Sequence, residues 1–132
     1  MAPIRMRSIV LDASSLLAFL LMEKGCEFVS SHLRAGLISA VNYSEVLTCT
    51  IDLGKPLTET IAEIGRLELS IVPHDAELAA IAASLRPKVK SLGLSFTDRS
   101  CLALGLSRQL PVLTGDRSWT QAGLDLEIIL IR

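Results

Sequence analysis

The chain has 132 residues, enough for one domain with a substantial core and too few for two. Half of the residues are hydrophobic and the formal net charge is −1, which excludes a disordered chain and any general attraction to polyanions. A contact with nucleic acid would therefore have to come from local groups of basic side chains. We expect a single domain over residues 1–132.

Three widely spaced cysteines, Cys26, Cys49 and Cys101, form no CxxC pair. Each lies in a helical or apolar context. This context favours buried, reduced thiols in a cytoplasmic protein over a disulfide framework or a zinc site.

The amino-terminal segment is crudely similar to a signal peptide, because Arg5 and Arg7 precede the apolar run 9–22. Asp12 interrupts that run, and no small-residue cleavage pattern follows it. No apolar stretch reaches the length of a membrane span. We therefore expect a cytoplasmic protein with no membrane partner.

The first half of the chain predicts strands that alternate with helices. Short β-branched runs that end at a polar residue are typical of buried parallel strands, and closely spaced leucines indicate helices. In chain order we expect a strand at 8–11, helices at 14–22 and 26–34, a strand at 36–40, a helix at 42–53 and a further helix after Pro56 that carries Ile61, Ile64 and Leu67.

The second half continues the alternation. We expect a strand at 69–72, a helix that Asp75 caps and that reaches Leu85, a loop with local positive charge at 86–93, a helix at 95–110, a strand at 112–114, a turn or short helix at 116–121 and a last strand at 127–131. This order predicts an α/β fold, with a mostly parallel central sheet of about five strands between two layers of helices.

Four acidic residues lie where a strand meets a helix or in the first turn of a helix: Asp12, Glu45, Asp98 and Asp116. The carboxyl ends of parallel strands share one edge of the sheet, so we expect these four side chains to gather there. Carboxylates in contact must share protons or bind a cation. Oxygen ligands without histidine or cysteine suit Mg²⁺ or Mn²⁺ better than zinc, and such a site suits phosphoryl chemistry.

Each acid also has an ordinary structural explanation. Asn42 with Glu45, and Ser95 with Asp98, both fit a capping box. Asp12 and Asp116 fit N-caps or turn residues. The set of four, placed after different strands, is harder to explain in this way than any one member.

Neighbouring polar residues fit supporting roles at the same edge. The hydroxyls of Ser14 and Thr114 suit the orientation of a water or a carboxylate, although local capping is an equally ordinary role. Arg99 and Arg117 adjoin two of the acids and suit contacts with phosphate oxygens, or else surface ion pairs.

The stretches VLDAS around Asp12, VNYSEV around Glu45, GLSFTDRSCLALG around Asp98 and LPVLTGDRSW around Asp116 together resemble the PIN domain family. More narrowly, the chain resembles the VapC-type toxin ribonucleases of type II toxin–antitoxin pairs. The resemblance spans the whole chain with its motifs in order.

This resemblance implies a metal-dependent endoribonuclease that a cognate antitoxin inhibits and that forms a homodimer. The family's metal-binding acids fall on Asp12 and Asp98, its additional active-site acids on Glu45 and Asp116, and its supporting hydroxyls on Ser14 and Thr114. The implied cofactor is Mg²⁺ or Mn²⁺, and the implied substrate is RNA.

Two other functions remain open. A phosphoaspartyl protein with Asp12 as nucleophile needs a second acid close by and a late lysine, but the second position after it is Ser14 and no lysine follows Lys90. A catalytically silent PIN fold that binds RNA or protein would be expected to lack one or more of the acids, and all four are present.

One histidine invites a different catalytic reading. His74 adjoins Asp75, as in a catalytic dyad, but no serine or cysteine elbow lies near the pair in the sequence. We therefore expect a surface or capping role for this histidine.

Overall fold

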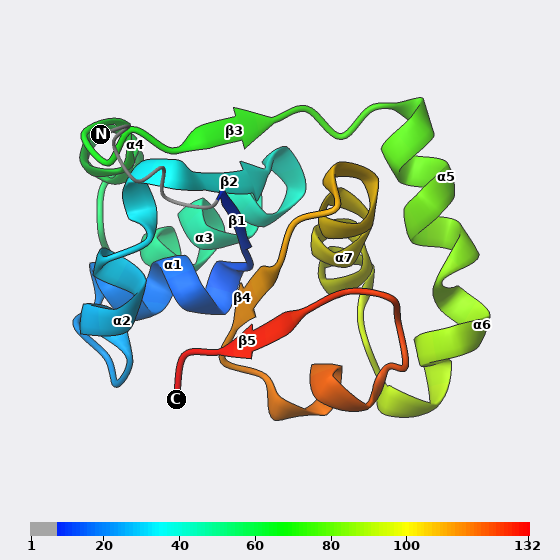
Figure 1. Cartoon of the computed structure of the whole chain (residues 1–132). Coiled ribbons are helices and arrows are strands. Elements are labelled where there is room, and N and C mark those ends of the chain that lie inside the picture. The colour runs from blue at the N-terminus through cyan, green and yellow to red at the C-terminus, as the bar shows by residue number, and fades with distance from the viewer. Residues whose placement is uncertain (1–7) are drawn as a thin grey trace, which may run out of the picture.

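A five-stranded sheet forms the centre of the molecule in the computed structural model, which describes residues 8–132 (Figure 1). Arg5 and Arg7, the basic residues of the signal-peptide-like segment, lie outside the described residues. All four strand pairings are parallel, and the strand order is β3-β2-β1-β4-β5. The strands are β1 (Ile9–Leu11), β2 (Gly36–Ser39), β3 (Ser70–Val72), β4 (Val112–Thr114) and β5 (Ile128–Leu130).

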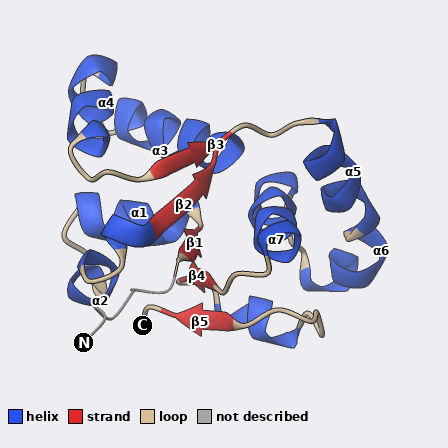
Figure 2. Ribbon diagram, turned by 45° about the horizontal axis from the view of Figure 1, so that its top comes forward, coloured by secondary structure: helices blue, strands red, loops and turns tan. Residues whose placement is uncertain are grey.

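Helices cover both faces of this sheet, as Figure 2 shows. One layer holds α1 (Ala13–Leu20), α2 (Cys26–Ser30), α3 (Ala40–Asp52) and α4 (Leu57–Gly65). The other layer holds α5 (Ala76–Ser84), α6 (Arg86–Val89) and α7 (Phe96–Arg108). Three short 3-10 helices, at Leu33–Ala35, Lys90–Leu92 and Arg117–Gln121, complete the described elements. The predicted α/β/α architecture is confirmed.

The core has two parts because successive residues of a strand point to opposite faces of the sheet. Ile9 and Leu11 belong to the cluster on the α1 side, whereas Val10 between them belongs to the cluster on the α7 side. All three are at most 2% exposed. The short apolar strands are thus buried on both faces, as expected for a parallel sheet between helices.

The strand order reverses between β1 and β4. From β1 the chain moves outward to β2 and β3, then returns to β4 on the other side of β1 and continues to β5. Open α/β sheets bind ligands at the carboxyl ends of the strands beside such a switch point. Asp12 follows β1 directly, and Thr114 ends β4.

Helix α7 lies close against β4 because Gly105 has no side chain. A Cβ atom at this position would lie 2.5 Å from Cγ2 of Val112, a distance that real Cβ atoms do not show. The close approach fixes α7, which carries Asp98 in its first turn, beside the strand that carries Thr114.

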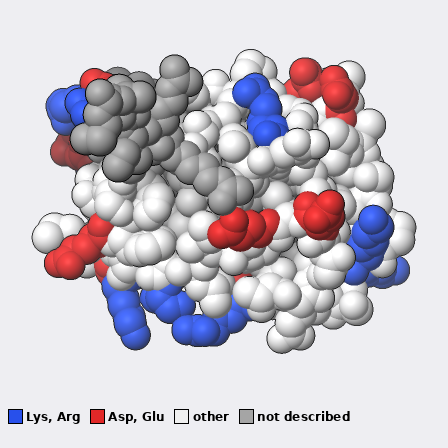
Figure 3. Space-filling model, in the orientation of Figure 1, with Lys and Arg blue, Asp and Glu red and all other residues white. Residues whose placement is uncertain are grey.

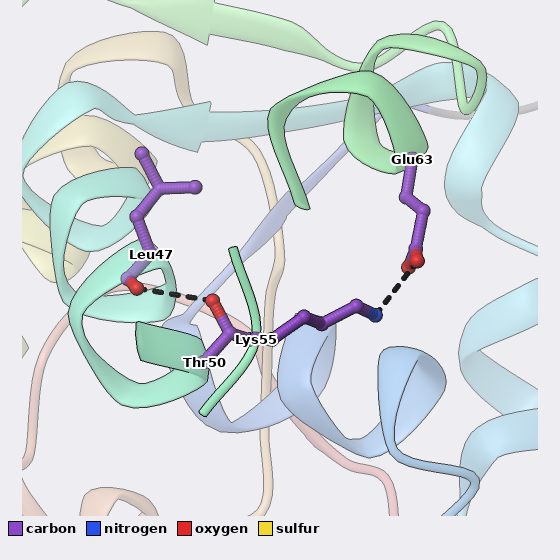
Figure 4. Close-up of polar contacts among 4 residues, drawn as sticks. All are labelled: Leu47, Thr50, Lys55 and Glu63. Carbon is purple, nitrogen blue, oxygen red and sulfur yellow. Dashed lines mark hydrogen bonds and ion pairs between the residues drawn. The ribbon is translucent and has the colours of Figure 1, made fainter. Parts of the chain in front are cut away.

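A half-buried ion pair fixes the turn between α3 and α4. Lys55 Nζ lies 2.7 Å from a carboxylate oxygen of Glu63, and both side chains are less than a third exposed. Figure 4 shows Lys55 reaching from the turn to Glu63 on α4, next to the hydrogen bond that Thr50 Oγ1 donates to the carbonyl of Leu47. The backbone N–H of Lys55 donates to the carbonyl of Thr50, which closes the end of α3.

Two predicted elements differ from the structure. Residues 86–93, expected to be a loop, form α6 and a 3-10 helix, because Pro87 is tolerated in a first helical turn and Val89 is fully buried. The helix expected at 26–34 ends at Ser30 and continues as a 3-10 turn. The other elements lie within a few residues of their predicted bounds.

The described residues contain three free cysteines and no disulfide, in line with the expectation of reduced thiols. Cys101 is fully buried, while Cys26 and Cys49 are partly buried. No helix within residues 8–132 has both the length and the apolar character needed to cross a membrane.

Candidate functional site

Asp12 is the N-cap of α1 and is only 5% exposed. Its carboxylate accepts hydrogen bonds from the backbone N–H of Ser15 at 2.8 Å, from Ser14 Oγ at 2.8 Å and from Thr114 Oγ1 at 2.6 Å. The bond from Thr114 joins the carboxyl ends of β1 and β4 at the switch point. Asp12 is therefore a helix cap, as its position indicated, and also a buried carboxylate where such sheets bind ligands.

Burial raises the pKa of Asp12 above its ordinary value of 3.8, because removal from water disfavours the charged form. Hydrogen bonds from Thr114, Ser15 and Ser14 favour the charged form and offset part of this effect. A nearby cation would offset more of it, so the carboxylate is suited to gain from a bound metal ion.

The stability of the metal-free protein should therefore depend on pH through Asp12. The pKa of Asp12 is higher in the folded than in the unfolded state. The stability that this residue contributes is therefore fully present below pH 3.8 and is lost as the pH rises through the folded-state pKa. We expect wild type to lose stability relative to Asp12→Asn as the pH rises from about 4 to about 7 in the presence of chelator. The difference between the two melting temperatures, wild type minus variant, should therefore decrease over this range. A difference that does not change with pH would contradict this electrostatic description.

Asp98 lies in the first turn of α7 and is half-buried. It forms the capping box that the sequence predicted: its Oδ2 accepts from the N–H of Ser95 at 2.9 Å, and its own N–H donates to Ser95 Oγ at 3.2 Å. The helix start is therefore well satisfied, and the capping explanation of this acid is confirmed as one of its roles.

Glu45 has no such capping role. Helix α3 begins at Ala40, and its N-cap is Ser39, whose Oγ accepts from the N–H of Val41 at 3.2 Å. The predicted capping box of Asn42 with Glu45 is therefore wrong, because both residues lie inside the helix. Glu45 is half-buried in the second turn of α3, so helix capping does not explain its carboxylate.

Cys101 shows that three of the acids share one neighbourhood. The pKa of this fully buried thiol is raised well above its ordinary value, first by burial and then by the negative charges of Asp12, Asp98 and Glu45. Asp12 directly follows β1, Asp98 lies on α7 and Glu45 lies on α3, so the three acids are far apart in the sequence. The thiol stays protonated among them and is unsuited to act as a nucleophile.

Asp116 lies further out, in the loop after β4, and is exposed. Its N–H donates to Thr114 Oγ1 at 3.0 Å, and its Oδ1 accepts from the N–H and Oγ of Ser118 at 2.9 and 2.7 Å. The neighbouring Gly115 N–H donates to Ser14 Oγ at 2.9 Å. The two predicted supporting hydroxyls, of Ser14 and Thr114, thus connect the Asp12 carboxylate to this loop.

The two arginines differ in their surroundings. Arg117 is exposed and donates to the carbonyl of Arg132 at 3.0 Å. Arg99 is half-buried, and its Nε atom is buried without a hydrogen-bond partner among residues 8–132. Neither forms an ion pair with an acid in the described part of the chain.

Asn42 is a polar residue of this region that the sequence analysis treated only as a cap. It is 1% exposed, and its Nδ2 donates to the carbonyl of Thr97 at 2.9 Å, so it joins the starts of α3 and α7. Its Oδ1 is buried with no partner in residues 8–132. The other buried residues of this helix are Val46 and Thr50. The signal available in the sequence was that Asn42 precedes them by four and eight residues and so shares their face of the helix.

His74 also differs from its prediction. A surface or capping role was expected, but both ring nitrogens are buried without partners among the described residues. The ring makes an edge contact with Phe96, with ring centres 5.8 Å apart. Asp75, its neighbour, caps α5 as predicted by accepting from the N–H of Leu78 at 2.9 Å.

The four acids do not form one contact cluster in this structure. Within residues 8–132, no three side chains of histidine, cysteine, aspartate or glutamate lie close enough together to hold a metal ion. Asp98 turns to Ser95 and Asp116 turns to Ser118, so local hydrogen bonds replace the mutual contact that the sequence led us to expect. The donor chemistry still fits Mg²⁺ or Mn²⁺, because the candidate ligands are all carboxylate oxygens.

The chain matches a known family model. The model of the PIN domain matches residues 9–124. A search of the curated proteins finds no match.

Several solved structures share the fold. A chain from a Klebsiella pneumoniae toxin–antitoxin complex superposes with a TM-score of 0.77 at 16% identity, covering 95% of this chain and 98% of that one. A chain of DNA-bound VapBC from Salmonella typhimurium superposes with a TM-score of 0.75 at 16% identity, covering 96% of this chain and 100% of that one. VapC20 from Mycobacterium tuberculosis, described as a sarcin–ricin loop cleaving toxin, superposes with a TM-score of 0.74 at 18% identity, covering 89% of this chain and 96% of that one. At identities this low, the superpositions establish a common fold and nothing beyond it.

Proposed function

The chain belongs to the PIN domain family, and we propose that it is a VapC-type toxin, a metal-dependent endoribonuclease that hydrolyses phosphodiester bonds in RNA. The observation that carries this proposal is the buried Asp12 carboxylate at the switch point, together with the hydrogen bond from Asn42 to the carbonyl of Thr97 that joins the starts of α3 and α7, the helices carrying Glu45 and Asp98. Carboxylates on three separate elements that start at this edge of the sheet suit binding of a divalent cation better than stability alone.

Asp12, Asp98, Glu45 and Asp116 are the residues that would hold Mg²⁺ or Mn²⁺. The ion would supply Lewis-acid stabilisation of the phosphate oxygens and a more acidic water. Thr114 and Ser14 hold the Asp12 carboxylate through hydrogen bonds, so its position is fixed before any ligand binds. Asp98 and Asp116 would have to exchange their hydrogen bonds with Ser95 and Ser118 for contacts with the cation.

The proposed partners follow from the same fold. Chains of similar fold occur in toxin–antitoxin complexes, and we extend to this chain a cognate antitoxin, a homodimeric state and a cytoplasmic location. Growth arrest on expression, with specific new 5′ ends in cellular RNA, is the direct test. Sequencing those ends after brief expression would also identify the RNA.

The second candidate function is a catalytically silent PIN fold that binds RNA or protein. The capping roles of Asp98 and Asp116 favour it, because local structure alone explains these two acids. Metal affinity separates the two functions. In calorimetry, a ribonuclease should bind Mn²⁺ and should lose this binding in Asp12→Asn. For a silent module, Asp12→Asn and wild type should give the same result.

RNA binding should depend weakly on salt. On the face drawn in Figure 3, basic side chains lie in small groups separated by neutral and acidic surface. The candidate contacts are Arg86, Lys88 and Lys90, all exposed, in α6 and the turn that follows it, together with Arg99 and Arg117, which adjoin Asp98 and Asp116 in the sequence. We expect roughly two to four phosphate contacts, and hence a slope of about −1.4 to −2.8 for log affinity against log salt on single-stranded RNA. A much steeper slope would indicate a basic surface formed by assembly.

A further inference from the structure

A pocket of about 730 Å³ opens beside Glu45, between α3, the loop after β3 and the start of α7. Its walls are mainly apolar, with a few hydroxyl groups, and its lining includes Val41, Ser44, Thr48, Pro73, His74 and Thr97. Glu45 is part of its wall, and Thr97 directly precedes Asp98. The pocket is therefore continuous with the proposed active site, and its size is typical of a ligand site.

One residue of the pocket lining, His74, has buried polar atoms without hydrogen-bond partners among residues 8–132. Six buried side-chain atoms in residues 8–132 have no hydrogen-bond partner, and four of them belong to Asn42, His74 and Arg99. Asn42 adjoins the pocket through the bond that it donates to the carbonyl of the lining residue Thr97, whereas Arg99 is not part of the lining. Buried polar groups almost always have partners, so two partnerless ring nitrogens in a pocket wall are expected where a ligand, rather than the protein, completes the bonding.

We propose that this pocket is a subsite for one nucleobase of a single-stranded RNA, next to the phosphate that is cleaved. The proposal rests on the proposed ribonuclease function and names where that activity reads its substrate. A base has a flat apolar face for the pocket walls and a polar edge with both donors and acceptors. An imidazole in its neutral form also offers one donor and one acceptor, and His74 places an imidazole in the pocket lining.

A base fits these surroundings better than the other parts of a nucleotide. The negative charge of Glu45 in the wall disfavours a phosphate, and the apolar lining gives little to a sugar. Phe96, which is 51% exposed, holds its ring against that of His74 near the pocket, and unstacked bases bind to rings of this kind. Position and chemistry therefore agree on a base beside the acids.

The test fills the pocket without touching the acids. Ser44 is an exposed residue of α3 in the pocket lining, so Ser44→Trp should occupy the space of the base while the helix remains intact. We expect KM for single-stranded RNA to rise roughly ten- to a hundredfold, the size of one base contact. Melting temperature and Mn²⁺ affinity should stay at the wild-type values.

His74→Phe keeps an aromatic ring and should relax the sequence preference at one position next to the cleavage site.

The matched control is Ser107→Trp, at an exposed serine near the other end of α7 and outside the pocket lining. It should leave KM and sequence preference unchanged. If Ser44→Trp cleaves with unchanged KM and preference, the base assignment is wrong. If Ser44→Trp instead changes the mass measured by light scattering, the pocket is a contact between copies of the chain, which also overturns it. If wild type cleaves no RNA at all, the proposed function fails first.

Discussion

Replacement of Asp12 by asparagine should reduce kcat/KM for RNA cleavage by roughly a thousandfold or more. Stabilisation of phosphate charge by a metal ion is worth several kcal/mol, and about 1.4 kcal/mol corresponds to a tenfold change in rate. An amide keeps the shape of the buried carboxylate and accepts the same hydrogen bond from the N–H of Ser15, but it supplies no negative charge to a cation. Asp98→Asn should behave in the same way. Initial rates with Mg²⁺ or Mn²⁺ measure both effects.

Asp75→Asn is the matched control for this substitution. Asp75 caps α5 by accepting from the N–H of Leu78 at 2.9 Å, much as Asp12 caps α1 at 2.8 Å. Asparagine and aspartate are equally good N-caps, so each variant should remain folded. Only the change at position 12 should remove activity. Equal activity in the two variants would show that Asp12 is a cap and nothing more.

Expression of the chain alone should arrest growth, and co-expression of a cognate antitoxin should restore it. Such a partner needs exposed apolar surface, and the apolar stretch 16–22 supplies it only in part because Leu16 is buried in the core. The available apolar surface is instead at the end of α1 and on α4. Leu21 and Met22 are 39% and 84% exposed there, and a small pocket of about 260 Å³ is lined by Phe19, Leu20, Glu63, Arg66 and Leu67.

Met22→Lys should separate toxicity from neutralisation. Because Met22 is exposed, a lysine there should leave folding and RNA cleavage intact while it weakens an apolar partner contact about tenfold or more. The antitoxin should then fail to restore growth at expression levels that rescue wild type, and Met22→Leu should behave as wild type. If Asp12→Asn arrests growth as strongly as wild type, toxicity does not come from this site.

The sheet was predictable because its strands are short apolar runs ending at polar residues. Ile9, Val10 and Leu11 followed by Asp12 combine a strand buried on both faces with a helix cap, and both signals are local. The segment 86–93 was not predictable in this way. Pro87 and nearby lysines are typical of a loop, and only the tertiary burial of Val89 favours a helical turn there.

The candidate site was predictable in position and less so in detail. Asp12 follows β1 and Thr114 ends the neighbouring β4, so their meeting at the sheet edge follows from parallel topology. The side-chain directions of Asp98 and Asp116 do not follow from topology, because each carboxylate has a competing local donor. The pocket beside Glu45 escaped prediction as well, since it needs the packing of α3 against the loop that carries His74.

Cleavage of a defined single-stranded RNA before and after metal removal tests the proposed metal-dependent activity most directly. The purified wild-type protein should cut the RNA in Mg²⁺ or Mn²⁺, lose this activity in excess chelator and regain it when Mn²⁺ is restored. Asp12→Asn should stay inactive at every step. Equal cleavage by wild type in excess chelator would contradict a metal-dependent site at Asp12.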